Sequence, residues 1–468
     1  MVLLGSLFRD VDFLAGPICF IILLMIFSVV IVKYKDGKMR TLFIKAFYFK
    51  MICALIFTVF ISFYYNGGDT EMYYFAGLHL HDAVVDDPGN FVKIFMTKVI
   101  NVKTPLMDYF IYDTSVYPVW EAMHSEGNFF VPKLALPFLL IFQKSYLSVA
   151  LAFSFFALGG CIRLYKFFTH YFPDYWREIA LATLFLPSAV FWSSGMLKDP
   201  ICFGSVGYLV YGVFSIVIKR KKIISSIIWV AVSVVLLFYI KPYILFALLP
   251  GIVLWLFTEM NKLIGNRILR NIFTVITLFV GAMSAFLLIQ YTTSDDSVKS
   301  YRLDTFIETS SANRNLYAGF SETEQGAYFT IGTKSPALLF LNGIVATFFR
   351  PFPWEISSPI VALSVIESMF FLFIALSVVF KRGLFYFFQK IFANPVFMLC
   401  FVFAIVFAAA VGSTATNFGS LSRYKIPCMP FFLVMILVLY RQAGLAYPKW
   451  LKRLLGYPIY LQKEKSGV

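Results

Sequence analysis

Residues 13–32 read FLAGPICFIILLMIFSVVIV, an apolar run without a single charge. An α-helix rises about 1.5 Å per residue, so about 20 such residues cross the roughly 30 Å hydrocarbon core of a bilayer. Asp10 and Asp12 precede the run, and the basic segment 33–40 follows it. These flanks are the reverse of those around a cleaved signal peptide. The run therefore predicts a transmembrane helix that is retained in the chain.

The same pattern recurs along the whole sequence. A shorter apolar stretch at 131–142 is typical of a re-entrant or interfacial segment. The sequence predicts an all-α fold, a polytopic transmembrane helical bundle of about eleven spans, in one membrane domain over residues 1–468. The predicted spans are 13–32, 43–65, 145–165, 178–196, 201–218, 223–240, 242–258, 271–291, 357–380, 395–411 and 425–440.

The composition leads to the same conclusion. Of the 468 residues, 60% are hydrophobic and only 14% are charged, and the mean hydropathy is +0.79. A soluble domain carries roughly a quarter charged residues, so this chain has more apolar surface than a water-soluble fold can bury. The aromatic content of 19% also suits a bilayer, where Tyr and Trp favour the interfaces.

The net charge of +15 is unevenly distributed between the two sides of the predicted spans. If the N-terminus lies outside, the cytoplasmic segments hold 24 of the 40 basic residues but only 5 of the 25 acidic ones. The positive-inside rule selects this orientation. The sequence thus predicts a protein of the cell (inner) membrane whose C-terminal tail, 441–468, lies in the cytoplasm. Two long loops, 66–132 and 292–356, then lie outside, and long loops in compact proteins usually carry function. The basic excess is a topology signal, so nucleic acid is not an expected partner.

Charged residues gather at the outer ends of the predicted spans, where their cost needs an explanation. The cations are suited to the phosphate of a lipid-linked substrate, because Arg can bind phosphate oxygens bidentately. A carboxylate beside them can accept a proton from an attacking hydroxyl. The predicted phosphate-binding residues are Lys198, Lys241, Arg350, Arg423 and Lys425, and the predicted catalytic carboxylates are Asp69, Glu71 and Glu355.

Most of these residues also have a structural interpretation. Asp69 is suited to capping a helix before Thr-Glu, and Lys198 to a salt-bridged turn. Lys241 and Lys425 are placed where a lysine can snorkel to the interface. Glu355 is close enough in sequence to pair with Arg350.

Three stretches carry a family resemblance. Asn66-Gly67-Gly68-Asp69 followed by Tyr73-Tyr74 is similar to the opening of the first external loop in the GT-C superfamily of integral membrane glycosyltransferases. The stretches 187–199 and 423–427 resemble segments of bacterial GT-C-like proteins from polysaccharide clusters. The resemblance implies that Asp69 is the general base and that the donor is a sugar on a polyprenyl phosphate. The chain departs from the family in one respect: the acidic loop usually follows the first span, whereas here it follows the second. Wzy-like polymerases resemble this chain too, and the external arginines would be Arg302, Arg314 and Arg350.

The sequence-based hypothesis is a membrane glycosyltransferase that moves a sugar from a polyprenyl phosphate or diphosphate carrier to a glycan or lipid acceptor outside the cytoplasmic membrane. The first alternative is a Wzy-like polysaccharide polymerase or O-antigen ligase, and the second is a lipid-linked sugar transporter or flippase. Six scattered cysteines and four histidines indicate neither a disulfide framework nor a metal site. No cofactor is predicted, and a requirement for a divalent cation (Mg or Mn) stays open.

Overall fold

The structure is a computed structural model of the chain. It describes residues 7–263, apart from 66 and 112–118, and residues 336–457, apart from 416, together with the isolated residues 268 and 272. Every regular element of this described part is a helix. The external arginines Arg302 and Arg314, the predicted span 271–291 and most of the second long loop lie outside the described residues.

Eight helices of the described part are long and apolar enough to cross a membrane, and a bent pair of helices brings the number to nine. The protein is therefore a multi-pass membrane protein, as the hydropathy predicts. The eight spans are α1 (Asp12–Ile31), α2 (Gly37–Phe60) continued by η1 (Ile61–Tyr65), α8 (Tyr146–Tyr171), α11 (Lys198–Phe214) continued by η3 (Ser215–Lys219), α12 (Ile223–Ile240), α13 (Pro242–Leu263), α17 (Pro359–Ala393) and α18 (Pro395–Thr414).

Two of the predicted spans are not single straight helices. The segment 178–196 divides into α9 (Trp176–Leu184) and α10 (Pro187–Trp192), because Pro187 has no N–H to continue the helix and instead opens a new one. The segment 425–440 is preceded by α19 (Phe418–Tyr424), which meets α20 (Met429–Gln442) at a bend of 77°. The prediction of about eleven spans is thus confirmed only as eight or nine among the described residues.

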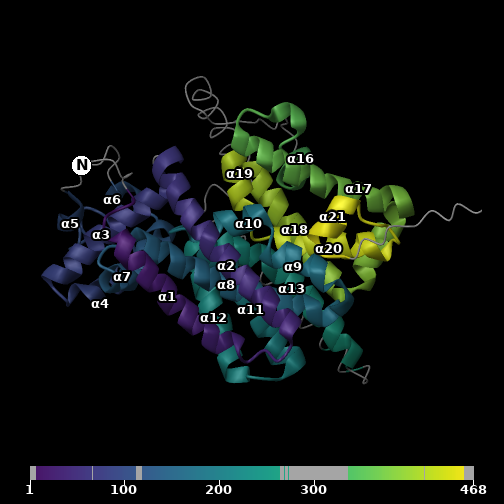
Figure 1. Ribbon diagram of the computed structural model, residues 1–468, viewed down its shortest axis with the longest axis horizontal. Helices are drawn as coiled ribbons and strands as arrows, with labels where there is room; N and C mark the ends of the chain where they lie inside the picture. Colours follow the sequence, from purple (N-terminus) through teal and green to yellow (C-terminus); the bar gives the residue numbers. More distant parts are fainter. Residues whose placement is uncertain are drawn as a thin grey trace, which may run out of the picture.

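Shorter helices form most of the first long loop, and they gather at one side of the molecule (Figure 1). The last helices of the chain lie at the other side in the same view. The helices that begin in the first long loop are α3 (Asp69–Asp86), α4 (Asn90–Met96), α5 (Asp108–Ile111), α6 (Val119–Ala122) and α7 (Glu126–Ile141). The other short elements are η2 (Pro173–Tyr175), α16 (Pro336–Phe349), η5 (Pro353–Glu355) and α21 (Lys449–Leu454). The apolar stretch at 131–142 belongs to α7, which is too short to be a span.

Helix α8 lies at the centre and packs against α1, α2, α7, α9 and α11. Its first turn is capped from another helix: the Asp12 carboxylate accepts a hydrogen bond from Ser145 Oγ at 2.6 Å and from the Leu147 backbone N–H at 2.9 Å. A carboxylate is favourable at a helix N-terminus, where the first N–H groups have no partner within the helix. The cap therefore fixes the start of α1 against the start of α8.

Backbone contact between α8 and α11 depends on small residues. A Cβ atom on Gly160 would lie 2.2 Å from the Gly204 carbonyl oxygen, and one on Gly207 would lie 2.2 Å from the Gly160 carbonyl oxygen. Small residues allow such close approach in membranes, where packing rather than hydrophobicity drives helix association. The contact brings the start of α11, with its charged residues, to the centre of the bundle.

We predict that Gly160→Ala will separate α8 from α11 and destabilise the protein by about 1–3 kcal/mol, the usual cost of overpacking a tight core. The measurement is the midpoint of thermal unfolding of the purified protein in detergent. Gly37→Ala is the matched control, because a Cβ atom on Gly37 meets no atom within 4 Å. Equal midpoints for the two variants would contradict the proposed backbone contact.

Candidate functional site

The first turn of α3 is held in place by hydrogen bonds from its second residue. Thr70 Oγ1 donates to the Met196 carbonyl oxygen at 2.9 Å and lies 2.8 Å from the Tyr146 hydroxyl. The turn before it needs glycine, since Gly67 and Gly68 have φ values of 114° and 88°, in a region that favours glycine. These contacts place Asp69 beside the start of α11.

The turn that precedes α11 is held by a buried lysine. Lys50 Nζ, from the middle of α2, donates to the Val190 carbonyl at 3.0 Å, and to the carbonyl and hydroxyl of Ser193 at 2.6 and 2.5 Å. These carbonyls end α10 and have no partner within that helix. An ammonium group with three donors satisfies them where water is excluded. The break between α10 and α11 is therefore stabilised by specific hydrogen bonds from Lys50.

A chain of four charged side chains lies where the helices that contribute them begin or end. Asp199, at the start of α11, accepts from Lys241 Nζ at 2.6 Å and from Arg423 Nε at 2.5 Å. A second nitrogen of Arg423 lies 2.8 Å from Asp69 Oδ2. The four residues come from α3, α11, the joint between α12 and α13, and α19. We call this group the ion-pair cluster.

The four side chains of the ion-pair cluster differ widely in exposure. The side chain of Asp199 is 2% exposed, Lys241 8%, Arg423 15% and Asp69 39%. Asp199 is therefore enclosed by its two partners, whereas Asp69 presents part of its carboxylate to the surroundings. Burial disfavours the charged form of Lys241, but the Asp199 carboxylate outweighs burial and raises the pKa of Lys241 above its ordinary value.

Two further side chains border the ion-pair cluster. Lys198 interacts electrostatically with Lys241, Asp69 and Arg423, and its Nζ lies 3.3 Å from the position of a Cβ atom on Gly127, at the start of α7. In the described part of the chain Lys198 forms no hydrogen bond or ion pair within the usual distances. With Lys198 included, the site holds three cations and two carboxylates, so it has one positive charge in excess.

Tyr73 lies one turn after Asp69 on the same helix, and its hydroxyl donates to Asn128 Oδ1 at 3.1 Å. Burial first, and the Asp69 carboxylate second, raise the pKa of Tyr73 well above its ordinary value, so it stays a neutral hydroxyl. The sequence analysis noted Asp199 and Tyr73 within motifs but assigned them no role, and it did not note Asn128. Asp199 carried a signal, because it adjoins Lys198 and Pro200 at the predicted start of a span.

The other predicted site residues are engaged elsewhere. The carboxylate of Glu71 folds back over Gly67, whose Cβ position it would overlap. Glu355 accepts from Arg350 Nε at 3.0 and 3.2 Å and from the Phe352 backbone N–H at 2.7 Å. These two form a separate pair in the link between α16 and α17, and the Arg350 guanidinium lies 5.4 Å from the Phe418 ring at the start of α19.

Lys425 also points away from the ion-pair cluster. It is 2% exposed, and the charge it faces is that of Glu367 on α17. Glu367 accepts a hydrogen bond from Ser188 Oγ at 2.7 Å. Lys425 lies in the bend between α19 and α20, so its contacts bear on the position of the neighbouring Arg423.

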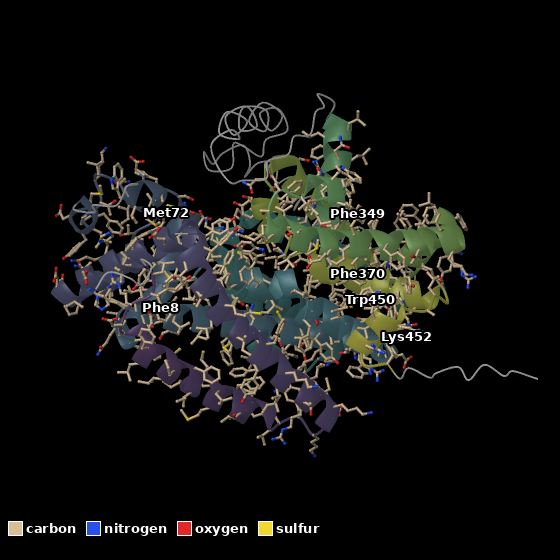
Figure 2. All side chains as sticks on the ribbon, turned by 45° about the horizontal axis from the view of Figure 1, so that its top comes forward. Phe8, Met72, Phe349, Phe370, Trp450 and Lys452 are labelled. Atoms are coloured by element: carbon tan, nitrogen blue, oxygen red, sulfur yellow. The ribbon has the colours of Figure 1, made fainter. Side chains whose placement is uncertain are left out.

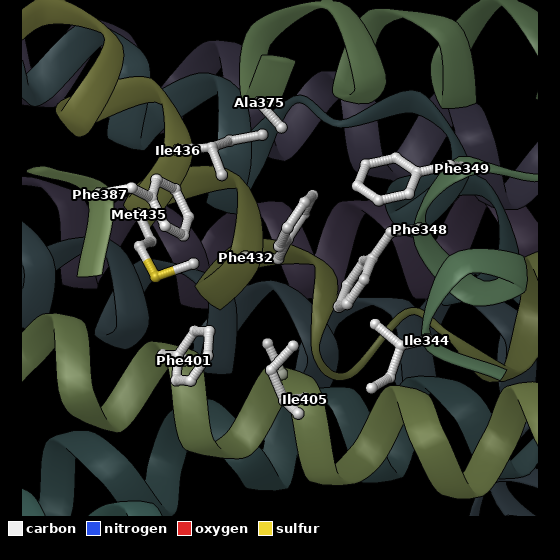
Figure 3. Close-up of a pocket in the computed structure, with 11 residues that line it drawn as sticks. Ile344, Phe348, Phe349, Ala375, Phe387, Phe401, Ile405, Phe432, Met435 and Ile436 are labelled. Atoms are coloured by element: carbon white, nitrogen blue, oxygen red, sulfur yellow. The ribbon is translucent and has the colours of Figure 1, made fainter. Parts of the chain in front are cut away.

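An apolar cavity with a volume of about 150 Å³ lies between α16, α17, α18 and α20. Figure 3 shows its aromatic walls, which include Phe348, Phe349 and Phe432, and every lining residue is apolar. Figure 2 places Phe349 well apart from Met72, which lies in the first turn of α3. None of the residues that line the cavity belongs to the ion-pair cluster, and none of them can act as an acid or a base.

The described residues contain no group of three or more His, Cys, Asp or Glu side chains that could hold a metal ion. Comparisons of the chain with protein-family models, with curated proteins and with solved structures find no match.

We predict that Asp199→Asn will destabilise the protein by about 3–5 kcal/mol, because it leaves Lys241 and Arg423 buried without their shared counter-charge. The measurement is the midpoint of thermal unfolding in detergent. Asp86→Asn is the control, because Asp86 is exposed at the far end of α3.

The pH dependence of this difference follows from Lys241. A lysine whose pKa is raised on folding contributes stability at pH values below its ordinary pKa of about 10.4, and that stability is lost as the pH rises through the raised value. Wild type therefore keeps this contribution up to about pH 10. In Asp199→Asn, burial acts on Lys241 without the carboxylate and lowers its pKa, so the variant loses the buried charge as the pH rises. The gap between wild type and Asp199→Asn should therefore be widest at neutral pH and narrow toward pH 10, and a gap that stays constant over this range would show that Lys241 is not held by Asp199.

Proposed function

We propose that the protein is a membrane glycosyltransferase of the GT-C type, which transfers a sugar from a polyprenyl phosphate or diphosphate carrier to a glycan or lipid acceptor. The proposal places the ion-pair cluster outside the cytoplasmic membrane, in agreement with the positive-inside rule. The observation that carries it is the pairing of a half-exposed carboxylate, Asp69, with an arginine that is itself held by a buried carboxylate. Such a site offers a base and a phosphate-binding cation side by side.

Asp69 acts as the general base in this proposal. Its carboxylate takes the proton from the acceptor hydroxyl as that oxygen forms a bond to the anomeric carbon of the sugar. The bond between the anomeric carbon and the phosphate oxygen breaks, and its electron pair stays on the phosphate. The proton remains on Asp69 until solvent removes it, so atoms and charges balance. Glu71, on the same turn, is the reserve base.

The cations bind the leaving phosphate. Lys198 is the first of them, because its ammonium has no carboxylate within ion-pair distance in the described part of the chain. Helices α3, α7, α11 and α13 all begin at this site, and helix N-termini favour negative charge. The excess positive charge and these four helix starts favour an anion over a neutral sugar.

Arg423 connects phosphate binding by the cations with proton removal by Asp69. Without substrate it is shared between Asp69 and Asp199. A donor phosphate that bound Arg423 would displace Asp69 and leave its carboxylate available to the acceptor. Asp199 stays in contact with Arg423 and Lys241, so it is a positioning residue and not a catalytic one. Arg350 and Lys425 act in this proposal through the position of α19.

One observation favours a transporter or flippase as the second candidate. Two segments are broken, between α9 and α10 and between α19 and α20, and transporters often bind substrate at discontinuous helices. A polymerase or ligase that uses polyprenyl diphosphate would need the same cations as the transferase. The products distinguish these functions.

We predict that Asp69→Asn will lower sugar transfer by about 10²- to 10⁴-fold, the usual contribution of a general base, while the protein stays folded. The measurement is release of polyprenyl phosphate or diphosphate in nanodiscs from a panel of lipid-linked sugars, with and without Mg²⁺. The control is Asp86→Asn on the same helix, which should keep full activity.

The released carrier separates a phosphate-dependent transferase from a diphosphate-dependent polymerase. Full activity of Asp69→Asn would exclude Asp69 as the base. No release from any donor, by wild-type protein shown to be folded, would favour the transporter.

A further inference from the structure

A second group of cations lies at the opposite ends of the same helices. Arg163 and Lys166 are on α8, one turn apart, and Lys219 and Lys222 are at the turn between α11 and α12. Lys219 and Lys222 are close enough to Lys166 to repel its charge. We call these four residues the inner cation group.

Arg163 lies inside the membrane-spanning part of α8. Eight residues separate it from the end of the helix at Tyr171, which corresponds to a depth of about 12 Å. A charged side chain at that depth is costly and needs a partner. Its only hydrogen bond to a described residue is from one nitrogen to the Gly159 carbonyl at 3.1 Å, so most of its five N–H donors have no protein acceptor.

Aromatic rings form the wall behind Arg163. The guanidinium carbon lies 4.1 Å from the centre of the Tyr208 ring and 5.4 Å from the Trp229 ring. These two rings are themselves stacked at 4.3 Å. The ring faces attract the cation but supply no charge that offsets its own.

Lys166 is bound in a similar way. Its ammonium donates to the Tyr34 hydroxyl and lies 4.4 Å from the Tyr34 ring. The charged groups that it faces are Lys219 and Lys222, while the titratable groups that Arg163 faces are Tyr208 and Tyr211. No carboxylate among the described residues is a neighbour of either cation; the nearby Asp36 faces Tyr165 and caps α2, and Glu259 faces His170.

The positive-inside rule does not account for this arrangement. Exposed lysines such as Lys33, Lys35 and Lys38 meet that rule without any burial. Arg163 and Lys166 are partly buried, Lys219 and Lys222 repel Lys166, and neither Arg163 nor Lys166 faces a carboxylate among the described residues. Cations in such surroundings are unfavourable unless an anion joins them. The charge, the free guanidinium donors and the location at the lipid boundary all indicate an anion with several oxygens.

We propose that the inner cation group is a binding site for a phosphate group, separate from the ion-pair cluster, and that an anionic phospholipid headgroup of the adjacent leaflet supplies it. Lys219 and Lys222 lie at the turn where α11 and α12 meet the membrane surface, and Lys166 and Arg163 lie deeper on α8. The proposal is independent of the proposed transfer reaction.

The test measures binding of phosphatidylglycerol and phosphatidylcholine to the detergent-purified protein by native mass spectrometry. Wild-type protein should prefer phosphatidylglycerol, and the double variant Arg163→Gln/Lys166→Gln should lose that preference by on the order of tenfold or more, since each basic residue near a membrane surface contributes about a fivefold effect. Lys381→Gln/Lys390→Gln is the matched control, because it removes two exposed cations from the same predicted side and should keep the preference. Arg163→Lys/Lys166→Arg should keep it as well.

A second arm distinguishes the two sources of a phosphate group. Inorganic phosphate and diphosphate are added as competitors; loss of bound lipid at equal concentration would assign the site to a soluble phosphate compound and not to a headgroup. Equal loss of preference in the site variant and the control, or no preference in wild type, would overturn the proposal.

A second measurement, the rise of the thermal unfolding midpoint on addition of lipid, tests the site even if the double variant folds poorly. A ligand that binds only the folded state raises the unfolding midpoint. Phosphatidylglycerol should raise the midpoint of wild type and of the control but not that of Lys166→Gln alone. A site with a purely structural role would instead lower the midpoint of Lys166→Gln without lipid and leave its response to lipid unchanged.

Discussion

In hydrocarbon, every backbone N–H and C=O group needs a partner within the protein, and the rest of this structure depends on how that constraint is met at one broken segment. The helix from Trp176 stops near Pro187, restarts, and stops again before Lys198. Lys50 supplies the missing donors to the carbonyls at the end of α10. Because that turn is fixed, α11 begins inside the bundle, and Asp199 enters the protein interior with Lys198 beside it.

A buried carboxylate cannot remain without cations, and this requirement explains the rest of the ion-pair cluster. Asp199 draws Lys241 from the joint of α12 and α13 and Arg423 from α19, which are 42 and 224 residues away in sequence. Arg423 has donors to spare after binding Asp199, and it uses one of them on Asp69. The half-exposed carboxylate is thus oriented by a chain of contacts that starts at a backbone break.

Much of this fold follows from the sequence, and the limits have physical causes. Hydropathy predicts all eight long spans of the described part, because a run of about 20 apolar residues has few alternatives to a transmembrane helix. It predicts 178–196 as one more span, since a hydropathy window does not register that Pro187 ends a helix or that a lysine elsewhere satisfies the freed carbonyls.

For the site, the sequence selects Asp69, Lys198, Lys241 and Arg423, which the structure brings together. It assigns Glu355 and Lys425 to the same site by their depth along the helices, although Arg350 and Glu367 hold them elsewhere. Depth is readable from hydropathy, but the direction of a side chain around its helix axis depends on packing.

Three of the cation sites among the described residues are accommodated in different ways, and the differences carry information. Lys241 and Arg423 have carboxylates, and Lys50 has backbone and hydroxyl oxygens, so each is satisfied within the protein. Arg163 contacts aromatic ring faces and donates to a single carbonyl. Among the described residues, most of its N–H donors therefore have no acceptor and its charge has no carboxylate beside it. Aromatic contacts contribute only about 0.5–2 kcal/mol, which is less than the several kcal/mol needed to bury a charge. Of the three arrangements, only this one lacks a full set of acceptors among the described residues. The same helices therefore carry an ion-pair network at one end and, at the other, two cations that face no described carboxylate, and in our proposal a phosphate headgroup of the membrane completes that site.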